Sequence, residues 1–232
     1  MDFYKFPQTP HIYNLGAATR DDSLLDANDI NKFLTNEITI EEKIDGANLG
    51  LKMNKEYTIE CQNRAKVVNS STQTQFSNLD GWIKNNYADL FTILENQNLI
   101  LFGEWMQAKH SIYYTNLPSY FVAFDIYDVT LKAFYSRAKF NEVMSQTSIP
   151  VVNVIFKGII ESKDKLINLL NVNSAYKDSE DNNRVIEGVY LRLDDEKSGT
   201  LLMRSKLVRA EFIQGIITHW SKITMTKNIV KY

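Results

Sequence analysis

The sequence contains one cysteine, Cys61, among its 232 residues. A single thiol cannot form an intrachain disulfide or a multi-cysteine metal site, so the sequence predicts a protein of a reducing compartment. Prolines and glycines are also few, 4 and 9, and thinly spread. No linker, repeat or low-complexity tract marks a domain boundary, and we therefore expect one domain over residues 1–232.

Long apolar runs and a dominant charge are lacking as well. No stretch approaches the roughly 20 apolar residues of a membrane span, and residues 1–16 lack the apolar run of a signal peptide, so we expect a cytoplasmic protein. The net charge is −2, which gives no global attraction for a polyanion. Any nucleic acid would have to bind a local basic groove. With 44% hydrophobic residues, the chain can bury a full core.

Apolar periodicity predicts strands for much of the chain. The strands are expected at residues 47–53, 57–62, 99–105, 120–127, 151–156, 185–193 and 201–206, and the first pair would place Lys43 just before a strand. Helices are expected at residues 75–96, with a buried aromatic stripe, and at 137–146, 163–171 and 210–221. Strands outnumber the helices needed for parallel crossovers, which predicts an antiparallel α+β domain. Residues 171–184 read as a mobile surface loop.

The segment EEKIDGANLG, residues 41–50, is the best candidate for chemistry. Lys43 follows two acids and precedes Asp45 and Gly46. A lysine amine attacks phosphorus only when unprotonated, and its ordinary pKa is about 10.4. Burial, or a cation such as Mg²⁺ or a second lysine, can lower that pKa, and the glycine lets the backbone approach a nucleotide closely. By themselves these residues would also suit a solvated lysine beside a turn.

Lys-x-Asp-Gly is the nucleotide-attachment motif of the covalent nucleotidyltransferases, which include DNA ligases, RNA ligases and mRNA capping enzymes. Other segments resembling that superfamily follow in order, each at the end of a predicted strand: CQNRAKVV, FGEW, YFVAFDIYD, VIEGVYLRL and LLMRSKLVRAEF. The chain is most similar to the compact bacterial and viral members of the RNA ligase family. This resemblance implies antiparallel sheets flanked by helices, in an adenylation domain of the DNA/RNA ligase type.

The resemblance also implies roles for individual residues. Lys43 would carry AMP, with Asp45 and Lys206 acting beside it in catalysis. Glu187 would bind a divalent metal, because Mg²⁺ prefers oxygen ligands and keeps several waters. Contacts to ATP are implied for Glu42, Ile44, Asn48, Arg64, Glu104, Phe124, Glu187, Arg204 and Lys206.

Three of these contacts have a stated chemistry. The Glu104 carboxylate offers two acceptor oxygens to the ribose hydroxyls, and Phe124 would stack on the purine. Lys206 would lie along the triphosphate and neutralise charge as pyrophosphate leaves. Taken alone, Phe124 would more often be a core residue, because strand aromatics usually are. Similarly, Arg64 would suit a surface strand end and Asn48 an ordinary strand-end hydrogen bond.

The last motif departs from the family pattern of two lysines one residue apart, because Arg204 stands at the first position. Arginine keeps its proton and binds phosphate in a planar fork, so the role of Arg204 is open and Arg209 is a substitute candidate. Residues 107–110, which follow Glu104, could reach substrate but are better interpreted as a solvated loop.

The function implied is that of an ATP-dependent RNA ligase with ATP and Mg²⁺ or Mn²⁺ as cofactors. AMP would pass from Lys43 to a 5′-phosphate RNA end, which is then sealed to a 3′-hydroxyl, in single strands or a nicked duplex. Too few residues follow Arg209 for a C-terminal OB-fold, so we expect the adenylation domain alone. A DNA-nick ligase, another adenylyltransferase, and a non-catalytic nucleotide- or RNA-binding protein with the same fold remain alternatives.

Overall fold

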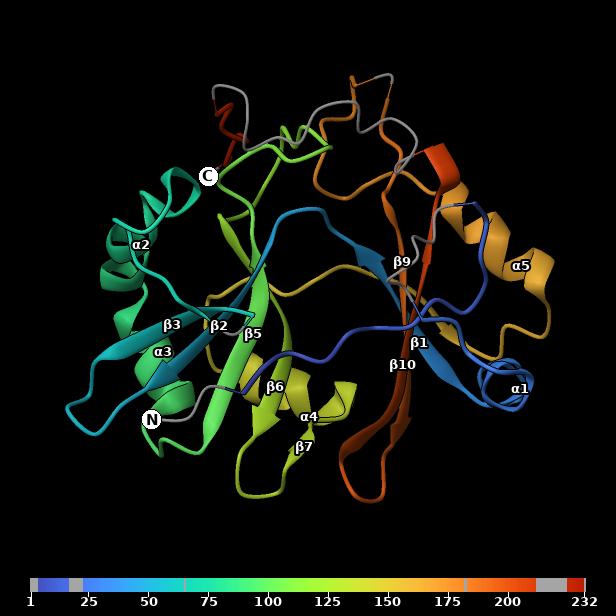
Figure 1. The fold of residues 1–232 in the computed structure, drawn as a ribbon, viewed down its shortest axis with the longest axis horizontal. Helices are drawn as coiled ribbons and strands as arrows, with labels where there is room; N and C mark the ends of the chain where they lie inside the picture. The colour runs from blue at the N-terminus through green and yellow to red at the C-terminus, as the bar shows by residue number, and fades with distance from the viewer. Residues whose placement is uncertain (1–3, 17–22, 65, 182, 212–224, 232) are drawn as a thin grey trace.

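Two antiparallel sheets stand side by side in this computed structural model, which describes residues 4–16, 23–64, 66–181, 183–211 and 225–231 (Figure 1). The larger sheet has the order β4 (Lys66–Val67), β3 (Ile59–Asn63), β2 (Ala47–Met53), β5 (Leu99–Trp105), β6 (Phe121–Asp128) and β7 (Ala133–Phe134). The smaller has the order β10 (Thr200–Val208), β9 (Gly188–Asp195), β1 (Ile38–Lys43) and β8 (Val154–Gly158). The predicted antiparallel α+β fold is confirmed.

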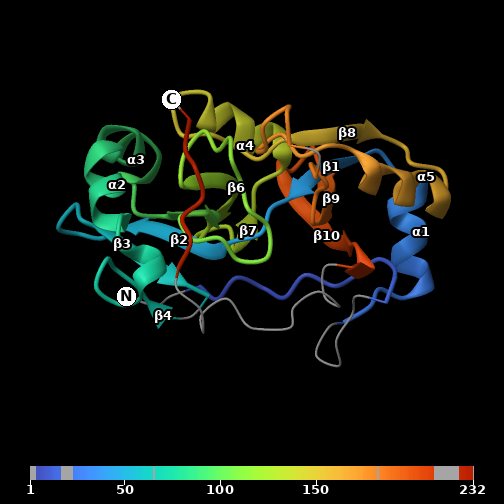
Figure 2. The same cartoon turned by 90° about the horizontal axis from the view of Figure 1, so that it is seen from above.

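Helices pack on the side of each sheet that faces away from the other sheet (Figures 1 and 2). The larger sheet carries α2 (Leu79–Asn85), α3 (Tyr87–Leu94) and α4 (Arg137–Met144), preceded by the 3₁₀ turn η1 (Thr74–Phe76). The smaller sheet carries α1 (Ala27–Thr35) and α5 (Lys163–Asn168), which continues into η2 (Leu169–Asn171). Each sheet therefore has its own apolar core, and the two remaining faces are turned toward each other.

The single helix predicted over residues 75–96 was wrong, because it breaks at Asn86. Asn86 ends α2 and begins α3, and its amide donates to the carbonyls of Trp82 and Ile83. The side-chain amide of Asn86 also donates to the Trp82 carbonyl at 2.8 Å. An asparagine that satisfies the last carbonyls of one helix in this way interrupts the helical ladder.

Strand β1 was not predicted, and it changes the position of Lys43. Lys43 is the last residue of β1, where it pairs with Gly188 of β9. The chain then crosses through residues 44–46 into β2, which belongs to the other sheet. Lys43 was expected just before the strand at residues 47–53, outside any strand. It stands instead at the crossover between the two sheets.

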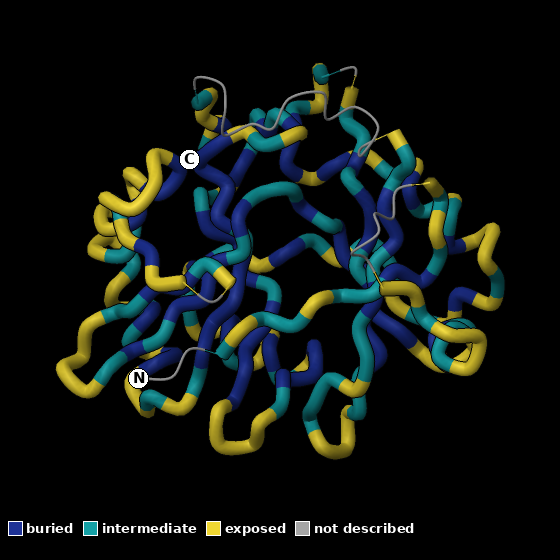
Figure 3. Tube along the Cα trace, in the orientation of Figure 1, coloured by how far each residue is buried: buried dark blue, intermediate teal, exposed yellow. Residues whose placement is uncertain are grey.

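Strand alternation determines which side chains of the smaller sheet face the larger one, because successive side chains point to opposite faces. Ile38 and Ile40 of β1 enter the core beneath α1 and α5. Glu41 and Lys43 therefore point to the other face, toward the larger sheet. Figure 3 shows the buried strand segments that line this meeting of the sheets.

Several smaller differences from the predictions concern loops and short elements. Helix α1 and the short strands β4 and β7 were not predicted. Residues 171–184 are not simply a mobile surface loop, because Ser174 and Tyr176 are buried. The helix expected at 210–221 lies mostly outside the described residues. In the part of the chain that the structure describes, no helix has the length and apolar character needed to traverse a bilayer.

The buried thiol of Cys61 gives a test of the fold. Cys61 is 4% exposed in the core beneath α2 and α3, and burial raises the pKa of its thiol to about 12. We expect the native protein to resist a thiol reagent at mildly alkaline pH, because the thiolate is the reactive form. Unfolding in concentrated guanidinium chloride should release one reactive thiol per chain. Rapid labelling of the native protein would contradict the placement of β3.

Candidate functional site

A pocket of about 130 Å³ lies where the two sheets meet at the end of β1. Residues of both sheets and of the N-terminal segment line it: Phe6, Glu41, Glu42, Lys43, Ile44, Asn48, Glu104, Phe124, Val152 and Tyr190. Six of the residues predicted for the site are among them, namely Glu42, Lys43, Ile44, Asn48, Glu104 and Phe124. The structure thus gathers residues that are up to 184 positions apart, from Phe6 to Tyr190.

Lys43 projects into this pocket and forms an ion pair with Glu187. Its Nζ lies 2.6 Å from Oε1 and 2.7 Å from Oε2 of Glu187, and the lysine side chain is 27% exposed. Burial lowers the pKa of Lys43, but the charges of Glu187, Glu104 and Asp45 raise it above the ordinary value. Burial thus acts in the expected direction, but the three carboxylates outweigh it in this arrangement and hold the amine as a cation.

Two carboxylates beside Lys43 are unusually easy to protonate. Burial raises the pKa of Glu104 to about 8 and that of Glu187 to about 7, although the charge of Lys43 opposes both shifts. The amide of Gly46 donates to Glu104, which fixes the carboxylate against the crossover. A Cβ at Gly46 would lie 2.7 Å from the Trp105 carbonyl oxygen. This glycine is therefore needed for close packing of the crossover against β5.

Two polar atoms in the pocket wall have no hydrogen-bond partner among the described residues. They are Oδ1 of Asn48 and the hydroxyl of Tyr190. Asn48 stands directly across from Glu104 in the pairing of β2 with β5. Buried polar groups are nearly always bonded, so unpaired ones in a pocket wall indicate a polar ligand. The residues present thus fit a nucleotide.

Phe124 reaches the pocket through an irregularity in β6. Phe102 pairs with Asp125 and Gly103 pairs with Ala123, so Phe124 is the extra residue of a β-bulge. Bulges beside functional sites redirect a side chain, and here the ring of Phe124 lines the pocket. Phe6 packs edge-on against Phe124, with ring centroids 5.5 Å apart.

The two neighbours of Lys43 that were also predicted for the site are held differently. Glu42 accepts hydrogen bonds from the Ser174 hydroxyl at 2.5 Å and the Ala175 amide at 3.0 Å. Burial raises the pKa of Glu42, and these hydrogen bonds offset part of that shift. Ile44 is buried in an apolar cluster that includes Tyr114.

Asp45 was predicted to be catalytic, but it does not line the pocket among the described residues. One carboxylate oxygen accepts from the amides of Ser111 and Ile112, at 2.6 and 2.9 Å. Its own amide donates to the Tyr114 hydroxyl at 2.9 Å. Asp45 thus ties the crossover to the loop that follows β5.

Four predicted or candidate cations also lie outside the set of described residues that line the pocket. Arg64 is exposed at the turn between β3 and β4. Arg209 donates to the Leu170 carbonyl at 2.7 Å and pairs with Glu211. Lys206 pairs in register with Tyr190, and its charge lowers the pKa of Glu187, so it stands at the edge of the site.

The Arg204 side chain lies on the face of the smaller sheet that is turned toward the larger sheet, where it already has two partners. Its guanidinium lies 3.3 Å from Asp125 and 3.8 Å from the ring centroid of Phe134. Both contacts are to the larger sheet. Arg204 thus links the two sheets, and neither it nor Arg209 is among the described residues that line the pocket.

The solvated loop expected at residues 107–110 was wrong at its first two positions, because Gln107 and Ala108 are buried. The Gln107 side chain accepts from the Asn78 amide at 3.1 Å and donates to the Ser77 hydroxyl at 2.7 Å. These bonds attach the loop to the start of α2, so Gln107 has a structural role.

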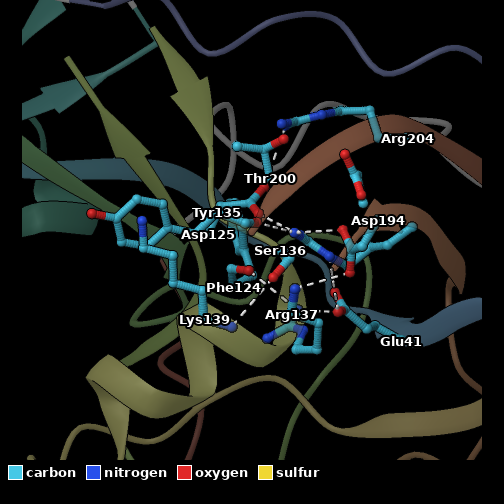
Figure 4. Close-up of polar contacts among 12 residues, drawn as sticks. Glu41, Phe124, Asp125, Tyr135, Ser136, Arg137, Lys139, Asp194, Thr200 and Arg204 are labelled. Atoms are coloured by element: carbon cyan, nitrogen blue, oxygen red, sulfur yellow. Dashed lines mark hydrogen bonds and ion pairs between the residues drawn. The ribbon is translucent and has the colours of Figure 1, made fainter. Parts of the chain in front are cut away.

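Behind the pocket, a buried network of charges joins the two sheets (Figure 4). Asp125 of β6 pairs with Arg192 of β9 and with Arg204 of β10, so both partners come from the opposite sheet. Arg192 also lies 3.5 Å from Asp194. The side chains of Arg192 and Asp125 are fully buried. Pairing of this kind is required, because an isolated buried charge is very unfavourable.

Arg137, the first residue of α4, extends the network to the pocket (Figure 4). Its guanidinium pairs with Glu41 and donates to the Phe124 carbonyl at 3.2 Å. Glu41 and Phe124 belong to different sheets, and both line the pocket. The network therefore fixes the relative position of the two walls.

Sequence reasoning missed four residues of the pocket: Phe6, Glu41, Val152 and Tyr190. Tyr190 follows Glu187 by three residues, an odd offset that puts the two on opposite faces of a regularly alternating strand, so the motif gave no signal for it. Glu41 was visible as the residue two before Lys43. Phe6 and Val152 carry no local signal, because each reaches the site through contacts made only in the folded chain.

Among the described residues, no group of three or more His, Cys, Asp and Glu side chains is arranged to hold a metal ion. In that part of the chain a divalent cation would therefore be held by fewer than three such side chains, of which Glu187 is the predicted one. Such a site suits Mg²⁺, which is commonly bound by one or two carboxylates together with substrate phosphates and water.

The paired sheets and the lysine at their crossover are those of a nucleotidyltransferase adenylation domain. The chain belongs to the RNA ligase family, whose model matches residues 36–208. Comparison with curated proteins gives no match.

Solved structures of an RNA ligase from Naegleria gruberi have a similar fold. The ligase solved with pyrophosphate is 15% identical, has a TM-score of 0.65, and aligns over 93% of this chain and 60% of its own. A lysine-to-alanine variant solved with ATP and manganese is 14% identical, with a TM-score of 0.64 over 90% of this chain and 57% of its own. The chain thus spans less than two thirds of these proteins, and the likeness establishes the fold.

Replacing Arg192 tests the charge network. Arg192→Met keeps the side-chain volume but leaves Asp125 and Asp194 short of a buried partner. We expect the free energy of unfolding to fall by about 3–5 kcal/mol, measured by chemical denaturation. Arg64→Met, an exposed control, should change it by less than about 0.5 kcal/mol. Equal small losses in both variants would show that the network does not hold the sheets together.

Proposed function

We propose that this chain is an ATP-dependent RNA ligase that first transfers AMP from ATP to Lys43. The observation that carries the proposal is the position of the Lys43 amine, in a pocket whose walls also present Glu104, Asn48 and Phe124. Family membership supports ligation of RNA ends rather than another use of the fold. Nucleotide binding alone would not require an amine at this point.

In this proposal different side chains of the pocket bind different parts of ATP. Phe124 stacks on the purine, and Tyr190 of the facing sheet supplies the hydroxyl that lacks a partner. Glu104 accepts from the ribose hydroxyls, and Asn48 contacts the phosphates. Lys206 is the cation along the triphosphate, because Arg204 is already paired with Asp125.

In the first step, the Lys43 nitrogen forms a bond to the α-phosphorus and the bond to the bridging oxygen of pyrophosphate breaks. The amine loses a proton to solvent, and pyrophosphate leaves with the electron pair. Mg²⁺ or Mn²⁺ held by Glu187 would neutralise the phosphates and weaken the hold of this carboxylate on the amine, which lowers the pKa of Lys43. The sheets contribute mainly positioning and charge neutralisation.

Two further transfers complete the reaction. A 5′-phosphate oxygen of the RNA attacks the same phosphorus, the bond to Lys43 breaks, and the amine recovers a proton. A 3′-hydroxyl then attacks the 5′-phosphate, loses its proton, and expels AMP. The three steps together consume ATP and release AMP and pyrophosphate.

Labelling with ATP carrying a radioactive α-phosphate tests the first step. With Mg²⁺ present, we expect the label to remain on the denatured protein, because the bond to Lys43 is covalent. Lys43→Ala should abolish the label. Lys43→Arg keeps the positive charge beside Glu187 but should be equally inactive, because the guanidinium group keeps its proton and is not a nucleophile. Labelling that survives Lys43→Ala would exclude the proposed nucleophile.

Sealing assays on matched nicked duplexes test the substrate. Duplexes with RNA on the 3′-hydroxyl side should be joined faster than all-DNA duplexes, and a single-stranded RNA with both ends available should be compared in parallel. Equal or faster joining of the all-DNA nick would assign the chain to DNA repair chemistry instead.

Phe124→Leu tests base stacking. We expect the KM for ATP in the labelling reaction to rise roughly 10-fold, because loss of one aromatic–base stack costs about 1–3 kcal/mol. The thermal midpoint should change little, since the ring is only half buried against Phe6. Loss of folding without a specific loss of ATP binding would identify Phe124 as a core residue.

A further inference from the structure

Residues 225–231 lie along residues 106–117 (Figure 2). We call the first range the C-terminal segment and the second the 106–117 loop. Backbone hydrogen bonds join them at both ends of the loop. The amide of Lys109 donates to the Thr226 carbonyl at 2.8 Å, and that of Leu117 donates to the Ile229 carbonyl at 3.0 Å. The C-terminal segment lies beyond the residues matched by the family model, which end at 208.

Asn228 is the centre of this contact, and its side chain is used completely. Its amide nitrogen donates to the carbonyls of Met106 and Ala108, at 2.8 and 3.2 Å. Its oxygen accepts from the Tyr114 amide at 3.0 Å. Asn228 is 2% exposed. An asparagine in such a position holds both ends of a loop in one geometry, because its two donors and its acceptor are all fixed.

The 106–117 loop in turn holds the crossover that follows Lys43. The amides of Ser111 and Ile112 donate to the Asp45 carboxylate, and the Tyr114 hydroxyl accepts from the Asp45 amide. Apolar packing follows the same route, since Ile44 and Tyr114 share one buried cluster against which Val230 packs. A continuous series of contacts therefore runs from Asn228 through Tyr114 to the residue two beyond Lys43.

We propose that Asn228 is a positioning residue for Lys43, acting through Tyr114 and Asp45. This inference rests on the proposed adenylation of Lys43. Asn228 does not line the pocket among the described residues, so it should affect the placement of the nucleophile rather than the capture of ATP. A small displacement of a nucleophile reduces rate far more than binding.

Single-turnover labelling of the 232-residue chain at saturating ATP measures this effect. We expect Asn228→Ala to slow formation of the covalent adduct by roughly 10- to 100-fold, with a much smaller change in the KM for ATP. The temperature should be well below the thermal midpoint of each variant. Asn228→Asp keeps the acceptor for the Tyr114 amide and should retain more of the rate. Lys227→Ala, at an exposed neighbouring position of the same segment, should behave as the parent.

A double-mutant cycle separates positioning from general stabilisation. Tyr114→Phe removes only the hydroxyl that accepts from Asp45, so it should slow the same step with an intact fold. If the effect of Asn228 passes through Tyr114, the double variant should be no slower than Asn228→Ala alone. Multiplication of the two losses would overturn the proposed route. Tyr114→Phe keeps the test available if Asn228→Ala does not fold, since an unchanged rate in this variant also overturns it.

The outcomes distinguish this inference from the proposed function. An absent adduct in the parent chain removes the adenylation on which both depend. A normal adduct in the parent, formed at an unchanged rate by Asn228→Ala, would contradict the positioning role alone. An equal loss of rate and of ATP binding in Asn228→Ala would assign this residue to general stabilisation of the pocket.

Discussion

The pairing of buried charges between the two sheets is the constraint on which the site depends. Asp125 on one sheet faces Arg192 and Arg204 on the other, and Arg137 connects Glu41 to the backbone at Phe124. Removing one member would strand a charge in a region with little water, so the sheets have one favourable arrangement. That arrangement brings the amine of β1 opposite the aromatic and carboxylate wall of β5 and β6. The geometry of the pocket is thus set largely by Asp125, Arg137, Arg192 and Arg204, which are not among the described residues that line it.

Local pattern predicted much of the fold. Strands β2 and β5 were predicted with the bounds that the structure gives, because β2 alternates apolar and polar residues and β5 contains a short apolar run. The order of motifs was also sufficient to place Lys43, Asn48, Glu104 and Phe124 in one pocket. These residues lie on or beside strands whose pairing the motif order implies. Periodicity thus determined the face of each strand, and motif order determined which faces meet.

The remaining features depend on contacts between distant residues, which periodicity does not specify. The alternation before Lys43 did not reveal that β1 pairs with β8 and β9 rather than with β2. The sequence also could not show that Arg204 is neutralised by Asp125, since these residues are far apart in the chain. Phe6 and Asn228 were unpredictable for the same reason. Both come from segments outside the family match. Phe6 completes the lining of the pocket, and Asn228 holds the 106–117 loop.

The crossover at residues 44–46 also determines how a bound ligand would affect the stability of the molecule. Lys43 belongs to the smaller sheet, whereas Glu104 and Phe124 belong to the larger one. Any ligand that contacts all three residues bridges the two sheets, and its binding free energy adds to the free energy of unfolding. Occupancy of the pocket by such a ligand and resistance to unfolding are therefore coupled in this architecture, and separation of the two sheets would release the ligand.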